Sequence, residues 1–223
     1  MAGRRKENDR EELKLRVVET ASKAFMSLGI RAVHMDDIAS SLSISKRTLY
    51  ELFGDKEELL LEVFRFYRRC MNEYMQEIAS SANNVLEVIL TFYERKFNEL
   101  CTVNPLFFRD LRKYSKVLDY IHDDRRRGDA DALAYFEKGV EQGIFRNDIN
   151  FQIINQAMAM QMDLLIYSDI TDHYPLAEIY SEITILHMRG ITTEKGYRMV
   201  DDFLKNIREK HVRLIFLLKI LYL

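Results

Sequence analysis

The sequence predicts an all-α protein in which a small N-terminal domain of three helices precedes a larger helical domain. Only 8 Gly and 2 Pro occur among its 223 residues, and these two residue types are the strongest helix breakers. Hydrophobic residues make up 48% of the chain, which is too many for a disordered polymer. They recur at three- and four-residue steps over most of its length, as amphipathic helices require.

Local signals delimit the first three helices. An apolar face repeats over residues 13–28, and Gly29 is expected to end that helix. A second, short helix is predicted over residues 35–42. After a turn of about three residues, Ser45 is well placed to cap a third helix over residues 46–53.

A long fourth helix connects the two predicted domains. Asp55 is expected to cap it, and its apolar stripe continues to about residue 80. We therefore divide the chain into a domain at 1–55, a connecting helix at about 56–80, and a domain at 81–223. Further helices are predicted over 84–101, 105–121, 124–143, 150–169, 175–189 and from 194 onward.

Two short helices joined by a tight turn have the layout of a helix-turn-helix. The third helix begins with cations and hydroxyls, which can donate to phosphate oxygens or to base edges. Arg47 has the reach and the planar fork to bind guanine in the major groove, while Thr48 and Tyr50 suit the flanking phosphates. The pattern alone also fits an ordinary solvated helix face.

Net charge does not decide between these readings. The whole chain carries a net charge of −2. Residues 1–54 contain 10 basic and 8 acidic side chains, whereas the remainder contains 23 and 27. So slight an asymmetry does not by itself indicate nucleic-acid binding.

Several fixed spacings hold together across residues 17–64. They comprise Ala24-Phe25 and Gly29, then Asp37-Ile38-Ala39, then Ser45-Lys46-x-Thr48-Leu49-Tyr50-x-x-Phe53, and finally Lys56-Glu57-x-Leu59-Leu60. This combination resembles the N-terminal DNA-binding domain of the tetracycline-repressor (TetR) family, and it is far more specific than a generic helix-turn-helix. The segment Met188-Arg189-Gly190-Ile191 with Lys195-Gly196 also resembles the region before the last helix of many members.

The resemblance implies that the third helix and the start of the fourth contact DNA. Lys46 and Arg47 would lie in or beside the major groove, and Thr48, Tyr50 and Lys56 would bind backbone phosphates. The complete set of expected contact residues in this region is Ser45, Lys46, Arg47, Thr48, Tyr50 and Lys56.

Four positions fall outside the family pattern. Arg4 and Arg5, which no motif fixes, are either a flexible arm that reaches along the minor groove or a disordered solubilising tail. Ser43 stands where the turn usually has Gly, at a cost of about 1 kcal/mol if its backbone is left-handed. His34 stands where Ser or Thr commonly caps the second helix, and it is a poorer cap.

By this resemblance, the chain would be a sequence-specific transcriptional regulator, a repressor that a small-molecule ligand releases from its operator. Its partners would be a palindromic double-stranded operator and a second copy of the chain. The alternative from another class is a helical protein-interaction module that keeps the fold but has lost specific DNA binding.

The larger domain is expected to form a homodimer. Residues 153–167 are apolar at 11 of 15 positions, so both faces of that helix need burial. The helix over 176–189 is the natural companion, with Ile179, Ile183 and Leu186 on one face. Two copies would form a four-helix bundle about a twofold axis. A buried core helix in a monomer would give the same pattern.

The same domain is expected to hold a small apolar or aromatic effector. The cavity is expected between the helices over 84–101, 105–121, 124–143 and 150–169. Aromatic and Met side chains at helical spacing are more often plain core, so most of these candidates are expected to belong to the core. The candidate lining residues are Phe92, Tyr93, Phe97, Phe108, Tyr120, Phe136, Met158 and Met162, with Arg109, His122 and Asn155 as polar contacts.

Nothing in the sequence predicts an enzyme, a metal site or a cofactor. The phosphate-binding, dinucleotide-binding, zinc-protease and serine-hydrolase motifs are all missing. Cys70 and Cys101 are far apart and have no ligand spacing, which fits a reducing cytoplasm.

The end of the chain, residues 211–223, is unusually apolar. Ten of its last twelve residues are hydrophobic. A membrane span needs about 20 such residues, so this tail is too short to cross a bilayer. We expect it to extend the last helix and to bury its apolar surface on the same domain or on a dimer partner.

Overall fold

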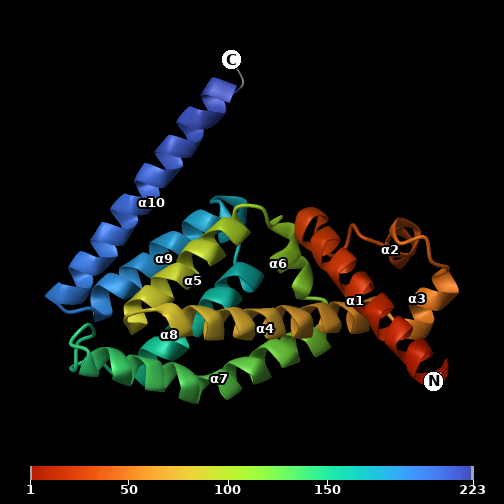
Figure 1. The fold of residues 1–223 in the computed structure, drawn as a ribbon, viewed down its shortest axis with the longest axis horizontal. Helices are drawn as coiled ribbons and strands as arrows, with labels where there is room; N and C mark the ends of the chain where they lie inside the picture. Colours follow the sequence, from red (N-terminus) through yellow and green to blue (C-terminus); the bar gives the residue numbers. More distant parts are fainter. Residues whose placement is uncertain (1, 222–223) are drawn as a thin grey trace.

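A computed structural model describes the backbone of residues 2–221 and the side chains of residues 7–207. Ten α-helices and one 3-10 turn account for most of this range. The N-terminal domain contains α1 (Ala2–Leu28), α2 (Met35–Ser41) and α3 (Lys46–Leu52). The long helix α4 (Lys56–Ser81) leads from these helices into the second domain (Figure 1).

The second domain packs six further helices along and around α4. Figure 1 shows α2 and α3 at one end of the molecule, while α10 begins at the opposite end. The elements of this domain are α5 (Val85–Leu100), α6 (Leu106–Leu111), α7 (Ser115–Glu141), α8 (Phe151–Tyr167), η1 (Ile170–Asp172), α9 (Leu176–Ile191) and α10 (Glu194–Leu221).

The predicted end of α1 and the predicted starts of α3 and α4 are confirmed, whereas α1 begins at Ala2, earlier than its apolar face suggested. Gly29 has a φ of 86° and directly follows α1. The Ser45 hydroxyl accepts a hydrogen bond from the Thr48 amide at 3.0 Å. Asp55 likewise accepts from the Glu58 amide at 2.8 Å. These contacts satisfy amide groups that a helix start leaves without an internal partner.

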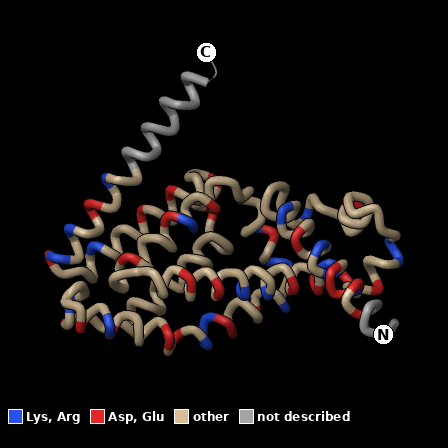
Figure 2. The backbone as a smooth tube through the Cα atoms, viewed as in Figure 1, with Lys and Arg blue, Asp and Glu red and all other residues tan. Residues whose placement is uncertain are grey.

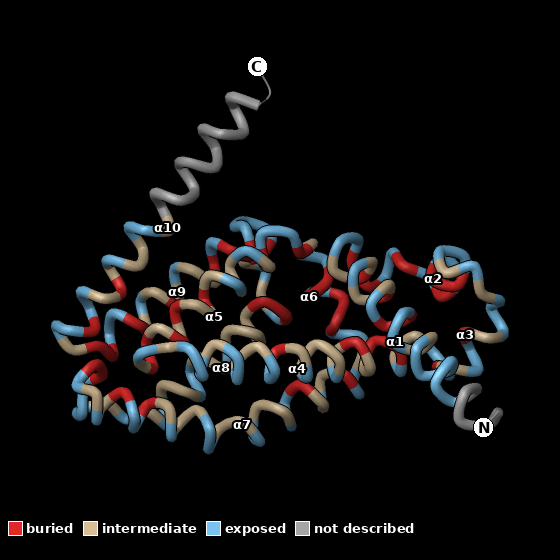
Figure 3. Tube along the Cα trace, viewed as in Figure 1, coloured by how far each residue is buried: buried red, intermediate tan, exposed pale blue. Residues whose placement is uncertain are grey.

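Two apolar clusters hold the fold together, and Figure 3 shows buried positions along both domains. The larger cluster joins α1–α4 to α6, α8 and α9, so the N-terminal helices share one core with part of the second domain. The smaller cluster lies where α5 begins and α7 ends, and it includes Phe136, Phe145 and Val200. An isolated antiparallel bridge joins Phe145 to Thr192 at this end.

One predicted helix boundary is wrong. The expected break between residues 121 and 124 does not exist, because α7 runs without interruption from Ser115 to Glu141. The chain instead turns just before it, at residues 112–114. Arg112 lies in this turn and donates to the carbonyls of Ile166 and, at 3.2 Å, Ser168 at the end of α8. A contact 54 residues away in sequence therefore marks the turn, and no local pattern could reveal it.

The described backbone is helical at both ends of the chain. The backbone of Arg4 and Arg5 belongs to α1, so it is neither the flexible arm nor the disordered tail considered for it but a continuation of the helix. Their side chains are outside the described range. The apolar tail 211–223 prolongs α10 as far as Leu221, but the burial expected for it concerns side chains outside the described residues. No helix in the described part is long and apolar enough to cross a membrane.

Candidate nucleic-acid interface

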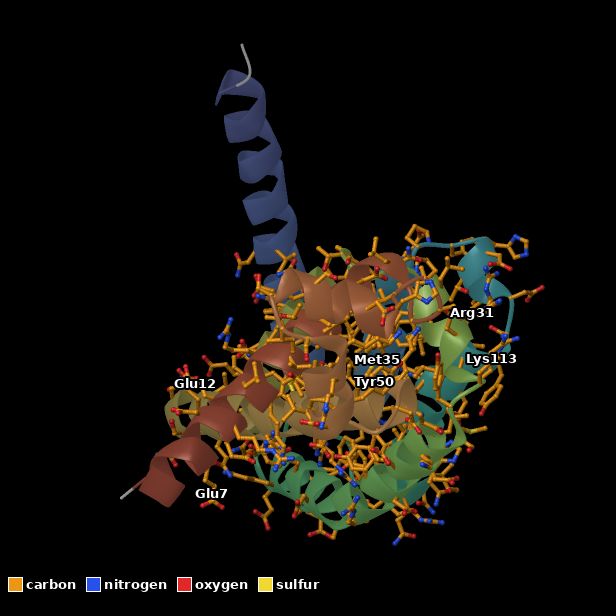
Figure 4. The ribbon with its side chains drawn as sticks, turned by 90° about the vertical axis from the view of Figure 1, so that its right-hand side faces the viewer. Glu7, Glu12, Arg31, Met35, Tyr50 and Lys113 are labelled. Atoms are coloured by element: carbon orange, nitrogen blue, oxygen red, sulfur yellow. The ribbon has the colours of Figure 1, made fainter. Side chains whose placement is uncertain are left out.

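Buried side chains fix α3 against the rest of the N-terminal domain. Leu49 is fully buried and Phe53 is 5% exposed. Ile38 and Ala39 of α2 are buried in the same cluster. Because one side of α3 is held in the core, its opposite side is presented to solvent, where Tyr50 is 41% exposed (Figure 4).

The turn between α2 and α3 depends on a left-handed residue. Ser43 has a φ of 54° and is the one non-glycine residue with positive φ in the described backbone. Its amide donates to the Ser40 carbonyl at 3.1 Å, and the Ile44 amide donates to the Ala39 carbonyl at 3.0 Å. These two bonds close the turn tightly and set where α3 begins.

Replacing Ser43 with glycine is expected to stabilise the protein by about 0.5–1 kcal/mol. The left-handed conformation costs a side-chain-bearing residue about 1–2 kcal/mol, and the greater freedom of glycine in the unfolded chain offsets part of the gain. Urea unfolding would measure it. Ser40→Gly is the matched control, since Ser40 lies within helix α2 and glycine there should destabilise by a similar amount. If Ser43→Gly destabilised as well, the turn would not be strained.

The cations of α3 are exposed, and both are paired with acids on the same surface. Lys46 donates to Asp36 of α2 at 2.9 Å. Arg47 donates through Nε to Glu51, one turn later, at 2.8 Å. These hydrogen bonds, followed by the charges of the two acids, raise the pKa of Lys46 and of Arg47. Figure 2 shows acidic and basic residues intermixed over the N-terminal helices.

The hydroxyl groups of the interface are arranged in two ways. Ser45 and Thr48 lie 2.7 Å apart, oxygen to oxygen, at the start of α3, so their hydroxyls already bond one another and the helix end. Tyr50 lies beside Lys46, whose Nζ is 5.9 Å from the ring centroid. Tyr50 therefore presents a half-exposed aromatic side chain with a polar tip next to a cation, and Tyr is among the side chains that bond phosphates in protein–DNA complexes.

Lys56 differs from the other expected contact residues because its ammonium group points inward. Its Nζ donates to the Val33 carbonyl and lies 5.7 Å from the centroid of the Phe25 ring. Burial lowers its pKa, and the charges of Asp110 and Asp37 oppose that shift. Here Lys56 ties the start of α4 to the loop before α2, a role that the sequence pattern does not reveal.

Replacing Lys56 with alanine is expected to lower the free energy of unfolding by about 1–2 kcal/mol, because the Val33 carbonyl loses a charged donor. Lys56→Arg is the matched control, since it keeps a cation that can reach the same carbonyl. Thermal and urea unfolding provide the measurement. An Ala variant with unchanged stability and weakened DNA binding would instead assign Lys56 to the phosphate backbone.

A second polar contact joins the N-terminal helices to the larger domain. Asp110 of α6 is 8% exposed, and its carboxylate accepts a hydrogen bond from the Arg31 amide at 2.7 Å. A Cβ on Gly29 would come within 2.9 Å of the Leu106 Cβ, so α6 packs closely against the end of α1. The sequence analysis missed this contact. Arg31 and Asp110 are 79 residues apart, and nothing in either segment indicates that they meet in the fold.

The residues predicted to line an effector pocket lie in more than one apolar cluster. Phe108 lies in the larger cluster with Phe97 and Met162 at its edge, whereas Phe136 belongs to the smaller one together with Met158. The remaining candidates are spread over several environments.

Most of the polar candidates already have partners. Arg109 pairs with Asp172 at 2.9 Å on the surface, and Asn155 donates to Asp129 at 2.8 Å. His122 lies 3.7 Å from Asp163.

The aromatic candidates Phe92 and Tyr120 are half-buried. Tyr120 packs against guanidinium groups of Arg65 and Arg127.

One cavity does include two of the predicted residues. Tyr93 and Phe97 of α5 line a space of about 230 Å³ between α5, α9 and α10. Tyr93 stacks on Tyr180, with ring centroids 5.6 Å apart, and its hydroxyl lies 2.8 Å from that of Ser181. A larger groove of about 500 Å³ lies between α1, α4 and α7, and none of the predicted pocket residues lines it. No group of acids, cysteines and histidines in the described part could hold a metal ion.

Comparison with known proteins points to one family. The model of bacterial regulatory proteins of the tetR family matches residues 17–63, the segment that contains α2, α3 and the start of α4. The transcriptional repressor KstR2 of Mycobacterium tuberculosis is 26% identical over 143 residues, which cover 62% of this chain and 72% of that protein. The transcriptional regulator HbdR of Aromatoleum is 24% identical over 203 residues, 83% of each chain.

Solved structures show the same fold. The structure of KstR2 from Mycobacterium tuberculosis matches with a TM-score of 0.54 at 21% identity, over 81% of this chain and 95% of that one. A putative regulator from Saccharomonospora viridis in complex with choline matches with a TM-score of 0.64 at 20% identity, over 82% and 100%. The tetR-family model shows that residues 17–63, with the capped helix-turn-helix of α2 and α3, form a helix-turn-helix domain of this family, and the curated relatives support a transcriptional regulator.

Proposed function

We propose that the protein is a dimeric repressor that binds a twofold operator through α3 and releases it when a small effector occupies the larger domain. The observation that carries this proposal is the exposed face of α3. Lys46, Arg47 and Tyr50 share that face, while Leu49 and Phe53 anchor the opposite one. A protein-interaction module would not need a cationic first turn in this position.

The proposed dimer uses the exposed apolar side of α8 and α9. Ile153, Met160 and Tyr167 of α8 are 62%, 64% and 53% exposed, and Leu186 of α9 is 73% exposed. Large apolar side chains exposed in one strip are typical of an interface. Ile179 and Leu186 were expected on one face of α9. In the structure Ile179 is buried in the core of its own chain, whereas Leu186 faces outward.

The proposed effector site is the cavity beside Tyr93 and Phe97. Its volume, about 230 Å³, is below the roughly 300–1,000 Å³ of most ligand pockets, so it suits a small effector unless the helices move apart. Choline is bound in one structural neighbour, and another is named as a ketosteroid regulator. Thermal shift assays with choline and with a ketosteroid, each repeated on Tyr93→Ala, test which chemistry this chain prefers.

Helix α4 supports communication between the two proposed sites. Its first turn is capped by Asp55 next to the helix-turn-helix. Further along, the Tyr67 hydroxyl receives a hydrogen bond from Lys96 at 2.7 Å and lies 3.0 Å from a Glu99 carboxylate oxygen. Burial, with the neighbouring Glu99 charge, raises the pKa of Tyr67, so the phenol stays neutral at physiological pH. A shift of α5 around an effector would therefore move α4.

DNA-binding measurements separate base reading from phosphate binding. On duplexes from the DNA flanking its own gene, Tyr50→Ala should weaken binding to all sequences alike, because phosphate contacts carry no base information. Arg47→Ala should instead relax the preference at one base pair per half-site, by about 1–3 kcal/mol. Fluorescence anisotropy on single-base variants of the bound site measures both. An Arg47→Ala variant with unaltered preference would show that another side chain reads the bases.

A further inference from the structure

Glu51 is an acid on a surface that should face the phosphates of DNA. It lies one helical turn after Arg47 on α3, and both side chains are largely exposed, 60% for Glu51 and 88% for Arg47. An acid here is repelled by the DNA backbone, so it lowers affinity for every sequence. The family motif does not fix this residue.

The hydrogen bond between the two side chains involves one particular edge of the guanidinium group. Arg47 Nε donates to Glu51 Oε1 at 2.8 Å. Nε is the inner donor, so the Nη1 and Nη2 pair at the far end stays available, and within the described part of the chain Glu51 is the acceptor that Arg47 bonds. That outer pair matches the O6 and N7 acceptors of guanine.

The backbone around Glu51 is held in place as well. Its carbonyl accepts a hydrogen bond from Arg10 Nη2 of α1 at 3.3 Å. Glu51 therefore lies on a helix braced from two sides, by the buried Leu49 and by this contact with α1. A long, flexible Arg side chain loses rotamer freedom when it binds a base, and a fixed neighbouring acceptor reduces that loss.

We propose that Glu51 is a positioning residue that holds Arg47 end-on for one guanine of each operator half-site. The carboxylate binds Nε and directs the Nη1 and Nη2 edge toward the base. Glu51 thus contributes sequence preference while it reduces overall affinity. This inference rests on the proposed DNA-reading role of α3.

The test compares Glu51→Ala, Glu51→Gln, Arg47→Ala and the double variant by anisotropy on the operator and on its single-base variants. Glu51→Ala should bind non-operator DNA more tightly than the wild type, yet discriminate about 2- to 10-fold less at the base pair that Arg47→Ala affects, as expected for the loss of one orienting hydrogen bond. Glu51→Gln keeps an acceptor for Nε and should retain most of the discrimination. In the Arg47→Ala background, Glu51→Ala should change nothing further at that base pair.

Glu12→Ala is the matched control, because Glu12 is an exposed acid of α1 in the same domain (Figure 4). It should leave base preference unchanged. Two results would overturn the inference: a Glu51→Ala variant that gains affinity on all DNA with its preference intact, or one that loses preference at a different base pair and still does so without Arg47. Specific wild-type binding in either case would leave the proposed function standing.

Discussion

The double variant Leu186→Arg, Met160→Arg is expected to be a monomer. Sedimentation at micromolar concentration should give it a mass near 26.5 kDa. Both side chains are mostly solvent-exposed within one chain, at 73% and 64%. The substitutions should therefore leave the fold of the protomer intact. In the proposed four-helix interface, however, each arginine would bring an unpaired charge into an apolar contact and would face its own copy near the twofold axis.

Operator binding should fall with the dimer, by about 100-fold or more. In a dimer, the second half-site is bound at the high effective concentration that the connection between protomers provides, and a monomer loses that advantage. Leu28→Arg is the control for surface charge, because Leu28 is a 56% exposed apolar residue of α1 outside the α8–α9 strip. A double variant that still sediments at twice the monomer mass would place the dimer interface elsewhere. Ile183→Arg would be a poorer test, since Ile183 also packs on the core of its own chain.

Replacing Gly139 with alanine is expected to lower the free energy of unfolding by about 1–2 kcal/mol. A Cβ at this position would lie 2.1 Å from Cδ2 of Phe145, a ring that is 2% exposed. Phe145 has little room to move, because it is packed among Phe136 and Phe151, which stack with centroids 4.8 Å apart. Overpacking of a core costs about 1–3 kcal/mol or more, and the better helix propensity of alanine recovers only about 1 kcal/mol.

The same helix provides a control with the opposite sign. A Cβ on Gly128 of α7 would meet only Arg68 Nη2, at an ordinary 3.6 Å. Gly128→Ala should therefore stabilise the protein by about 0.5–1 kcal/mol. Combining Gly139→Ala with Phe145→Leu replaces the obstructing ring by a smaller side chain. The double variant should recover part of the lost stability. If Gly139→Ala were as stabilising as Gly128→Ala, the smaller cluster would be more loosely packed than these contacts indicate.

The helix-turn-helix could be predicted from the sequence because its signals are local. Ser45 and Asp55 cap the helices that follow them, and Gly29 ends the first helix through a left-handed conformation. Each signal acts within about four residues, so it is readable along the chain. The sequence analysis did not predict the pairing of Arg47 with Glu51, although residues four apart lie on one face of a helix.

Other features of the fold depend on contacts between segments that are distant in the sequence, and only the tertiary structure shows them. The turn at residues 112–114 accompanies hydrogen bonds to the end of α8, and Lys56 turns inward to the Val33 carbonyl in the loop before α2. The expected effector residues separate into different clusters for a related reason. Helical periodicity shows which side chains face inward, but not which helices meet around them. The sequence by itself therefore determined the helix-turn-helix, whereas packing decided which buried rings border a cavity.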